Sequence, residues 1–472
     1  MRRWDLAALA LLAGCAVGPR YEPPQPPAGA AAPLVSLNPQ AETTAQPPDA
    51  WWRLYNDPRL DAYLDEAFAA NNDLKAAEAN LSAARAALEG ARAGTYPSTG
   101  IEAGTIYGRD PTTDEILEIA GAKPATTWID DALIDVSYEF DLFGRVRRQV
   151  EAARADAAAA EAGRDVFRIT IAAETTRAYA QVCALGEQLA VARQSYETVS
   201  REAEINRQRR QAGAGSEFDV VRAEALAAQA RAAIPPLEGQ RRAALFQLAA
   251  LIGRTPAHAP AEAEACVAPP KLSALIPIGD GTALLKRRPD IRLADRRLAA
   301  ATARVGVATA DLYPRIQLTG FYGGFATDPS DLFRSVGLGW GLGPKISWAF
   351  PNQAGPRARV RQAKAGADAA LDTFDGAVLQ ALKETEQALT TYGAELDHRQ
   401  ALADAQAKAQ QALDMAHGQY VAGSLSTLDL LTSEQALVAA DAAVAASDSA
   451  LAQDQIAVFK ALGGGWRNGG AG

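Results

Sequence analysis

A long run without proline constrains the fold of this chain more than any other feature. Residues Gly144 to Arg210 contain no proline and few glycines, and they are rich in alanine, arginine and glutamate, which favour helix. At about 1.5 Å per residue, a helix of this length would reach roughly 100 Å. Such a helix cannot belong to a compact globule, so we expect it to run in a bundle or a coiled-coil tube.

The second half of the chain repeats this pattern. We expect a long helix from about Pro356 to Gln419, a break at Gly423, and a return helix from about Ser426 to Leu462. The first half has its break at residues 211–215 and a return helix over about 216–252, perturbed at Pro235-Pro236. Three pairs of markers lie 210 positions apart: Gly213 and Gly423, Asp219 and Asp429, Glu224 and Glu434.

A shorter helix precedes each long one and ends at a Tyr-Pro pair. Asp57-Pro58 predicts a helix start, with Asp57 as N-cap, and we expect this helix to run to about Ala93. The stretches Asp73 to Tyr96 and Asp290 to Tyr313 have equal length, and proline follows each tyrosine. Because the residue before proline disfavours helix, each joint predicts a change from helix to strand.

Alternating residues predict four strands, two in each half. One face of the second strand is apolar from Ala132 to Phe140, and the other carries Asp131 and Asp135. In the fourth strand, large apolar residues from Val336 to Trp348 share one face. The other face carries glycine from Gly337 to Gly343 and then Lys345 and Ser347. This pattern fits a strand between lipid and a wet lumen, and also a half-buried soluble sheet. The expected strands are Ser98–Gly108, Trp128–Phe140, Arg315–Phe325 and Ser335–Phe350.

We therefore predict a mainly α fold with a small β part. Four strands cannot close a membrane barrel, and an open sheet edge in lipid leaves backbone groups unpaired. The smallest familiar barrels have about eight strands, so the chain must pool strands with copies of itself. Three copies would give a twelve-stranded transmembrane β-barrel, and the long helix hairpins would continue as a periplasmic α-barrel.

The amino terminus carries an export signal: Arg2 and Arg3 precede an apolar core, and Cys15 follows Ala13-Gly14. This order resembles a bacterial lipoprotein signal, with cleavage before Cys15 and lipid on its thiol. The alternative is an ordinary signal peptide with an incidental cysteine. No apolar run reaches the ~20 residues that a membrane-spanning helix needs.

Few residues in the chain suggest a redox, metal-binding or catalytic site. Cys183 and Cys266 could form a disulfide in an oxidising periplasm, or they could remain two separate buried thiols. The three histidines lack the spacing of metal ligands, and no nucleophile–base pair or phosphate loop stands out. We predict no enzyme activity, no cofactor and no metal. The net charge of −9 argues against nucleic-acid binding.

The repeat and the Pro-rich stretches divide the chain into six parts. We expect a signal peptide at 1–14, a lipidated Pro-rich tether at 15–50, a first repeat at 51–253, a linker at 254–280, a second repeat at 281–465 and a flexible tail at 466–472.

Several motifs together resemble the TolC-like outer-membrane factor family, in its NodT-type branch of efflux lipoproteins. They are CAVGPRYEPP from Cys15, WWRLYNDPRLDAYLDEAFAANNDL from Trp51, GDGTALLKRRPDIRLADRRLAAATARVGVATADLYPRIQLTG from Gly279 and AGSLSTLDLLTSEQALVAA from Ala422. The resemblance implies a homotrimeric efflux tunnel through the outer membrane. Its partners would be a periplasmic membrane-fusion adaptor and an inner-membrane pump of the resistance-nodulation-division type. Ala16 after the cysteine implies delivery to the outer membrane.

The resemblance also points to the hairpin tips as the place where the tunnel is controlled. Leu428 lies where the family has an apolar ring that narrows the closed tunnel, and Phe218 is its repeat mate. The acidic position four residues later is Thr432 here, so Asp219 and Asp429 could supply the charge instead. The alternative is that both aspartates cap the return helices and that Gly213 and Gly423 serve only as turn residues.

Three other interpretations of the chain are open. One is a tunnel of the same fold that serves protein or peptide secretion. Another is a structural periplasmic coiled-coil lipoprotein, against which the alternating strands and the Tyr-Pro joints argue. A surface binding module is a third, but the loops that would face outward, at about 109–127 and 326–334, are short.

Overall fold

The computed structural model describes residues 16–464, apart from residues 37, 39–40, 110–114, 116–117, 120, 122, 124–125 and 273–274. The predicted lipid attachment at Cys15 and the tail at 466–472 therefore lie outside the described residues. The chain forms two compact units, each built from three stretches. The strand unit takes residues 1–25, 80–160 and 293–374, and the helical unit takes residues 26–79, 161–292 and 375–472.

The two long helices are present as predicted. Helix α5 spans Arg145–Gln211 and α10 spans Ala354–Val421, with 67 and 68 residues. The second return helix is a single element, α11 (Thr427–Ala461), whereas the first is divided into α6 (Glu217–Ala232) and α7 (Ile234–Leu251). The division falls just before Pro235, because a proline nitrogen cannot donate and is tolerated in the first turn of a helix.

The prediction of one helix from Pro58 to Ala93 was wrong. Helix α2 (Pro58–Ala70) ends at Asn71, whose backbone is extended, and α3 (Asn72–Ala93) follows. The Asn71 side-chain oxygen accepts hydrogen bonds from the backbone nitrogens of Asp73 and Leu74, at 2.9 and 3.1 Å. A side chain that satisfies these first donors starts a new helix. Helices α8 (Gly281–Arg287) and α9 (Pro289–Ala310) precede the second pair of strands.

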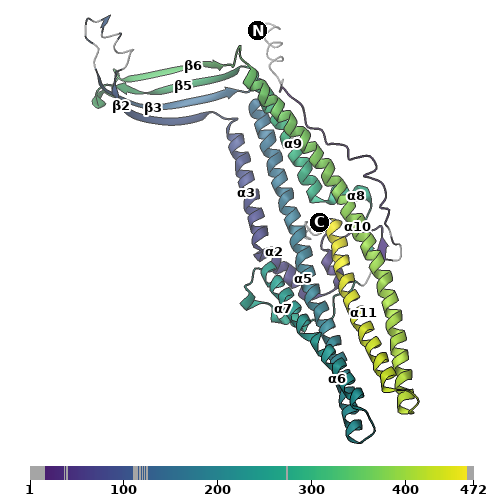
Figure 1. Cartoon of the computed structure of the whole chain (residues 1–472). Helices are drawn as coiled ribbons and strands as arrows, with labels where there is room; N and C mark the ends of the chain where they lie inside the picture. Colours follow the sequence, from purple (N-terminus) through teal and green to yellow (C-terminus); the bar gives the residue numbers. More distant parts are fainter. Residues whose placement is uncertain are drawn as a thin grey trace. The chain divides into compact units, whose positions relative to one another are not determined.

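The four predicted strands form one antiparallel sheet in the order β2-β3-β5-β6 (Figure 1). The fourth is shorter than expected and begins at Leu338. The backbone nitrogen of Gly337 donates to the Arg334 carbonyl at 2.9 Å, so a turn occupies the place where the strand was predicted to start, at Ser335. The strands are β2 (Ser98–Gly108), β3 (Thr127–Phe140), β5 (Arg315–Ala326) and β6 (Leu338–Ser347).

The register gives this sheet one apolar and one polar face. Cross-strand partners share a face, and the pairs Ile101–Ile134 and Tyr322–Trp340 belong to the apolar one. The opposite face holds the charged residues Asp131, Asp135 and Lys345 among small and polar ones. It also includes a few apolar side chains: Ile106, Ile129, Leu133, Phe321 and Phe325. Isoleucine, leucine and tryptophan side chains of the apolar face are more than half exposed in the single chain: Ile101, Trp128, Ile134, Trp340, Leu342 and Ile346.

A core of large side chains holds the helical unit together. The rings of Trp51 and Phe459 stack with 4.8 Å between centroids, and both are fully buried. Cys183 on α5 is joined by a disulfide to Cys266 in the linker, 83 residues later. The Arg241 guanidinium donates to the Cys266 carbonyl at 2.9 Å, which adds a second attachment between the linker and the helices.

The segment expected to be a tether is extended but makes specific contacts. In the helical unit, β1 (Glu42–Thr43) pairs in parallel with β4 (Ile276–Pro277), which lies in the linker. The Glu386 carboxylate accepts from the backbone nitrogens of Val35 and Ser36. In the strand unit, the Val17 nitrogen donates to the carbonyl of Phe143 at 3.1 Å. Among the described residues, no helix is long and apolar enough to cross a membrane.

Candidate functional site

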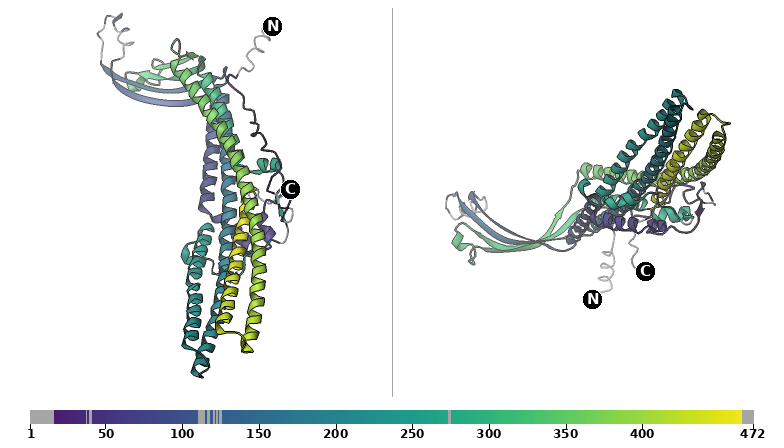
Figure 2. Two further views of the ribbon diagram at one scale, coloured as in Figure 1. Left: turned by 45° about the vertical axis from the view of Figure 1, so that its right-hand side comes forward. Right: turned by 90° about the horizontal axis from the view of Figure 1, so that it is seen from below.

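The tips of the two helix hairpins contain all six residues singled out for control of the tunnel. Figure 2 shows α6 returning beside α5, and α11 returning beside α10. Gly213 and Gly423 each adopt positive φ, +77° and +72°. After each glycine, a backbone nitrogen bonds the carbonyl five residues earlier: Ala214 to Arg209 at 2.8 Å, and Ser424 to Gln419 at 2.9 Å. Glycine after a helix end permits this left-handed turn without strain.

The aspartates of the tips belong to the starts of the return helices. The N-caps are Ser216 and Ser426, and not the aspartates themselves, which corrects the simple capping interpretation. Asp219 and Asp429 lie three residues later, and their backbone nitrogens donate to the serine hydroxyls at 3.1 and 3.3 Å. The hydroxyls donate back to the carboxylates at 2.6 and 2.7 Å.

This arrangement gives each aspartate a local structural role. At the first tip the Ser216 backbone nitrogen also donates to the Asp219 carboxylate at 3.4 Å, which completes a capping box. At the second tip the serine and the aspartate are joined through the serine hydroxyl. The spacing Ser-x-x-Asp was visible in the sequence and could have identified both serines. All four side chains are nevertheless exposed, or partly so, and the carboxylates stay accessible to ions in solution.

The two apolar tip residues are solvent-exposed in the single chain. Phe218 is 70% exposed and Leu428 is 43% exposed, and each immediately precedes the aspartate of its tip. Hydrophobic side chains at such positions in a loop-to-helix junction are available to a neighbouring chain or to the axis of an assembly. The structure therefore brings Phe218 together with Asp219, and Leu428 together with Asp429, once in each hairpin.

One contact joins the two hairpins at the tip. The Arg209 guanidinium, near the end of α5, lies 5.0 Å from the centre of the Tyr420 ring, near the end of α10. It also donates to the Tyr420 hydroxyl. Sequence reasoning did not find this pair, because neither residue belongs to the repeat markers and only the fold brings them together across more than 200 positions.

A buried carboxyl group lies one helical turn beyond the second tip. Glu434 on α11 is only 5% exposed, and its Oε2 atom has no hydrogen-bond partner among the described residues. Burial, with a smaller contribution from the charge of Glu202 on α5, raises the pKa of Glu434 to about 7. Its repeat mate Glu224 is exposed and bound to Arg207 at 2.6 Å. Glu224 and Glu434 therefore occupy matching positions of the two halves, but one is exposed and paired and the other is buried.

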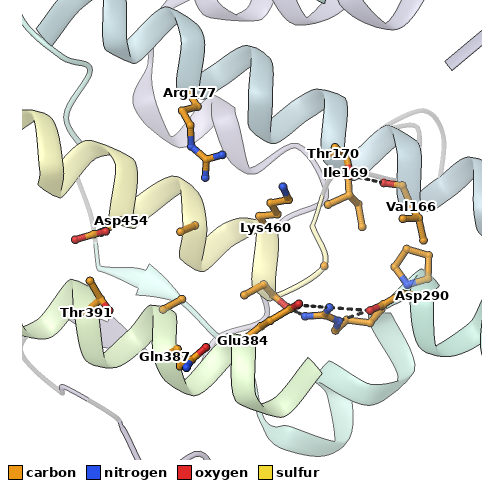
Figure 3. A pocket seen from close by; sticks show the side chains of 16 residues that line it. Val166, Ile169, Thr170, Arg177, Asp290, Glu384, Gln387, Thr391, Asp454 and Lys460 are labelled. Atoms are coloured by element: carbon orange, nitrogen blue, oxygen red, sulfur yellow. Dashed lines mark hydrogen bonds and ion pairs between the residues drawn. The ribbon is translucent and has the colours of Figure 1, made fainter. Parts of the chain in front are cut away.

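A cavity elsewhere in the helical unit is lined by an ion-pair cluster. A cavity of about 390 Å³ lies among α5, α9, α10 and α11 in the helical unit (Figure 3). Its buried Arg288 binds Asp290 and Glu384, each at 2.7 Å. Burial lowers the pKa of Arg288, but its hydrogen bonds to these two carboxylates more than offset this and raise it. Within the described part of the chain, no three side chains are arranged to hold a metal ion.

Comparisons with known proteins match nearly the whole chain. Nodulation protein T of Rhizobium leguminosarum bv. trifolii is 28% identical over 461 residues, which cover 97% of this chain and 96% of the relative. Pyoverdine export outer membrane protein OpmQ of Pseudomonas aeruginosa is 30% identical over 429 residues, with 89% and 88% covered.

The fold is equally well matched among solved structures. The structure of the outer-membrane channel OprN superposes with a TM-score of 0.88 at 34% identity, and covers 96% of this chain and 100% of that chain. A family model described as outer membrane efflux protein matches residues 63–254 and 282–464. The chain therefore belongs to the outer membrane efflux protein family.

Proposed function

We propose that this outer-membrane protein is the channel of a tripartite efflux pump, in which three copies form one tunnel for drugs or other small toxic compounds. The four-stranded sheet supports this proposal best. Its outer strands β2 and β6 each pair on one side only within the described chain, and one face is apolar. In lipid, the unpaired edges would be costly. If β6 of one copy pairs with β2 of the next, the backbone groups of both edge strands are hydrogen-bonded, and three copies close a twelve-stranded barrel.

The helices suit the other half of the tunnel. Each chain supplies two long hairpins, α5 with α6 and α7, and α10 with α11. Six hairpins from three copies would wall a periplasmic α-barrel. The tips would then meet the periplasmic adaptor protein, and through it an inner-membrane pump of the resistance-nodulation-division type. Lipid on Cys15 would add an anchor to the barrel.

The proposal assigns the tips a gating role. In a trimer, Leu428 and Phe218 would surround the axis and narrow the closed tunnel, and Asp219 and Asp429 would place carboxylates beside them. A rim of carboxylates favours cations over anions. The bonds to Ser216 and Ser426 already explain why aspartate suits these positions locally, so the gating role must be tested separately.

The observations favour a channel over the two alternatives. In a periplasmic scaffold, the broad apolar face of this sheet would be exposed to water, which is unfavourable. A tunnel for protein secretion would share this fold, but the relative OpmQ is named for export of pyoverdine, a small molecule. We therefore propose export of small compounds.

Conductance of the purified full-length protein in planar bilayers tests the proposal. We expect discrete channels with a preference for cations, and a larger conductance for the double variant Leu428→Ser with Asp429→Ala. The matched control is Asp414→Ala, an exposed carboxylate on α10 that is bonded to Gln410 and should not change the current. Absence of channels from every variant would refute the tunnel, while equal currents in wild type and double variant would refute only the gate.

A further inference from the structure

We infer that the polar face of the sheet carries a site for organic cations that contain an aromatic group. The site is built from Phe321, Phe325, Asp131 and Asp135. This inference rests on the proposed function, because it requires the polar face to line the tunnel. It goes further in naming a substrate class and the residues that would recognise it.

Two phenyl rings lie on the face that carries Asp131 and Asp135. The same face also holds Glu102 and the aliphatic side chains of Ile106, Ile129 and Leu133. In the register, Phe321 is opposite Asp135 and Phe325 is opposite Asp131, so all four side chains share one face. An outer-membrane strand normally directs its apolar residues to lipid and its polar residues to the lumen. Phe321 and Phe325 depart from this rule, and they are 41% and 44% exposed on the wet face.

Glycines on β6 provide the space in which the rings rest. A Cβ atom added at Gly341 would come within 2.7 Å of the Phe321 ring, and one added at Gly339 would lie 3.8 Å from the Phe325 ring. The two rings meet edge to face, with centroids 5.9 Å apart and planes at 89°. The rings are therefore packed against the wall and against each other, and present aromatic surface to water.

The carboxylates lean in the opposite direction, over glycines of β2. A Cβ atom at Gly104 would lie 3.1 Å from Asp131 Oδ1, and one at Gly100 would lie 3.1 Å from Asp135 Cγ. Glu139, on the same face, is bound by Arg145 at 2.8 Å. No ion pair or hydrogen bond to the side chain of Asp131 or Asp135 is found among the described residues.

The chemistry of this patch selects its ligand. Each ring has a carboxylate directly across the strand pair, at a Cβ separation of roughly 5 Å. A cation that carries an aryl group can approach the carboxylate with its charge while its ring packs on phenylalanine, and the phenyl face attracts the cation as well. An anion of the same size would gain the ring contact but would be repelled by the carboxylates. Three copies would repeat the patch around the tunnel.

Block of the bilayer current tests the inference. All variants carry Leu428→Ser and Asp429→Ala, so that conduction does not depend on the tip. The probe is benzyltriethylammonium, and tetraethylammonium and benzenesulfonate are the comparison ions. Replacing Phe321→Leu and Phe325→Leu should raise the half-blocking concentration of benzyltriethylammonium roughly fivefold, with little effect on tetraethylammonium and on the K⁺/Cl⁻ permeability ratio. Asp131→Asn with Asp135→Asn should weaken block by both cations and lower that ratio.

The glycines supply a matched pair of substitutions on one strand. Gly341→Ala should displace the Phe321 ring and change block by the aryl cation, whereas Gly343→Ala has nothing within 4 Å of the new Cβ and should leave block unchanged. Equal block of the parent channel, which carries only the tip substitutions, and of the phenylalanine double variant would overturn the inference but not the proposed channel function. Stronger block by benzenesulfonate than by the aryl cation would also overturn it. Absence of any current would overturn the proposed function, and the inference with it.

Discussion

Glu434 predicts that packing at the second tip weakens as the pH rises. Burial raises the pKa of this carboxyl from 4.5 to about 7. The closed tip therefore holds Glu434 mainly as the neutral acid below neutral pH, and a state that releases it into water lets it ionise. Burial of this carboxyl carries no free-energy penalty below pH 4.5, where the group is protonated in water as well. The full penalty is reached above pH 7, where the group is ionised in water.

The magnitude follows from the same shift. A difference of 2.5 between 4.5 and about 7 corresponds to at most about 3.4 kcal/mol, since one pKa unit is about 1.4 kcal/mol. Water that reaches the tip screens part of this, so we expect roughly 1–3 kcal/mol. The ratio of open to closed tip should then rise about 5- to 150-fold between pH 4.5 and 8, provided that opening exposes the residue.

The substitution Glu434→Gln tests this reasoning. Glutamine keeps the shape and cannot ionise, so the variant should lose the pH dependence and resemble wild type at low pH. Hydrogen exchange at the amides of the first turns of α11, measured from pH 5 to 8 after correction for intrinsic rates, reports the opening. The matched control is Glu224→Gln, which alters the exposed repeat mate. Identical pH profiles for wild type and Glu434→Gln would refute the reasoning.

Three further changes address stability and anchoring. Asp57→Ala removes the N-cap of α2 and the acceptor of the 2.6 Å bond from Tyr179, so thermal unfolding should show a loss of roughly 1–2 kcal/mol above pH 3.8; no change would contradict the cap. Cys183→Ser leaves Cys266 unpaired and should cost roughly 2–5 kcal/mol in denaturant titrations, an effect that reductant should reproduce in wild type only. Cys15→Ser should abolish incorporation of labelled lipid and reduce membrane retention more than folding, and a soluble monomer would contradict this.

The sequence predicted the elements of the fold better than their ends. Long helices without proline and strands with strict alternation have strong local signals, and α5, α10 and β2 were placed within about two residues. The predicted helix from Pro58 to Ala93 was wrong because Asn71 caps a new helix with its side chain. Asn71, Asn72 and Asp73 are residue types typical of a helix start, so the sequence did carry a signal for this break.

The sequence predicted the parts of the site that depend on local turns. It did not predict the parts that depend on contacts between different helices. Glycine and aspartate at matching positions of the two repeats located both tips. The contact of Arg209 with Tyr420 and the burial of Glu434 depend on which helices become neighbours, and periodicity within one helix cannot supply that information. The sequence likewise did not decide whether Cys183 and Cys266 form a disulfide. The fold brings their Cα atoms to 4.8 Å, and they are bonded.

The environments of the two repeated glutamates suggest how a duplicated chain can divide its tasks. Both tips keep glycine in the turn and serine with aspartate at the start of the return helix, because these solve a local backbone problem that is the same in both. Glu224 pairs with Arg207 in water, and Glu434 is buried without a partner for one oxygen. The first hairpin should therefore be insensitive to pH near neutrality and the second sensitive. If the tunnel opens at its tips, the second hairpin is the one whose packing a proton can stabilise.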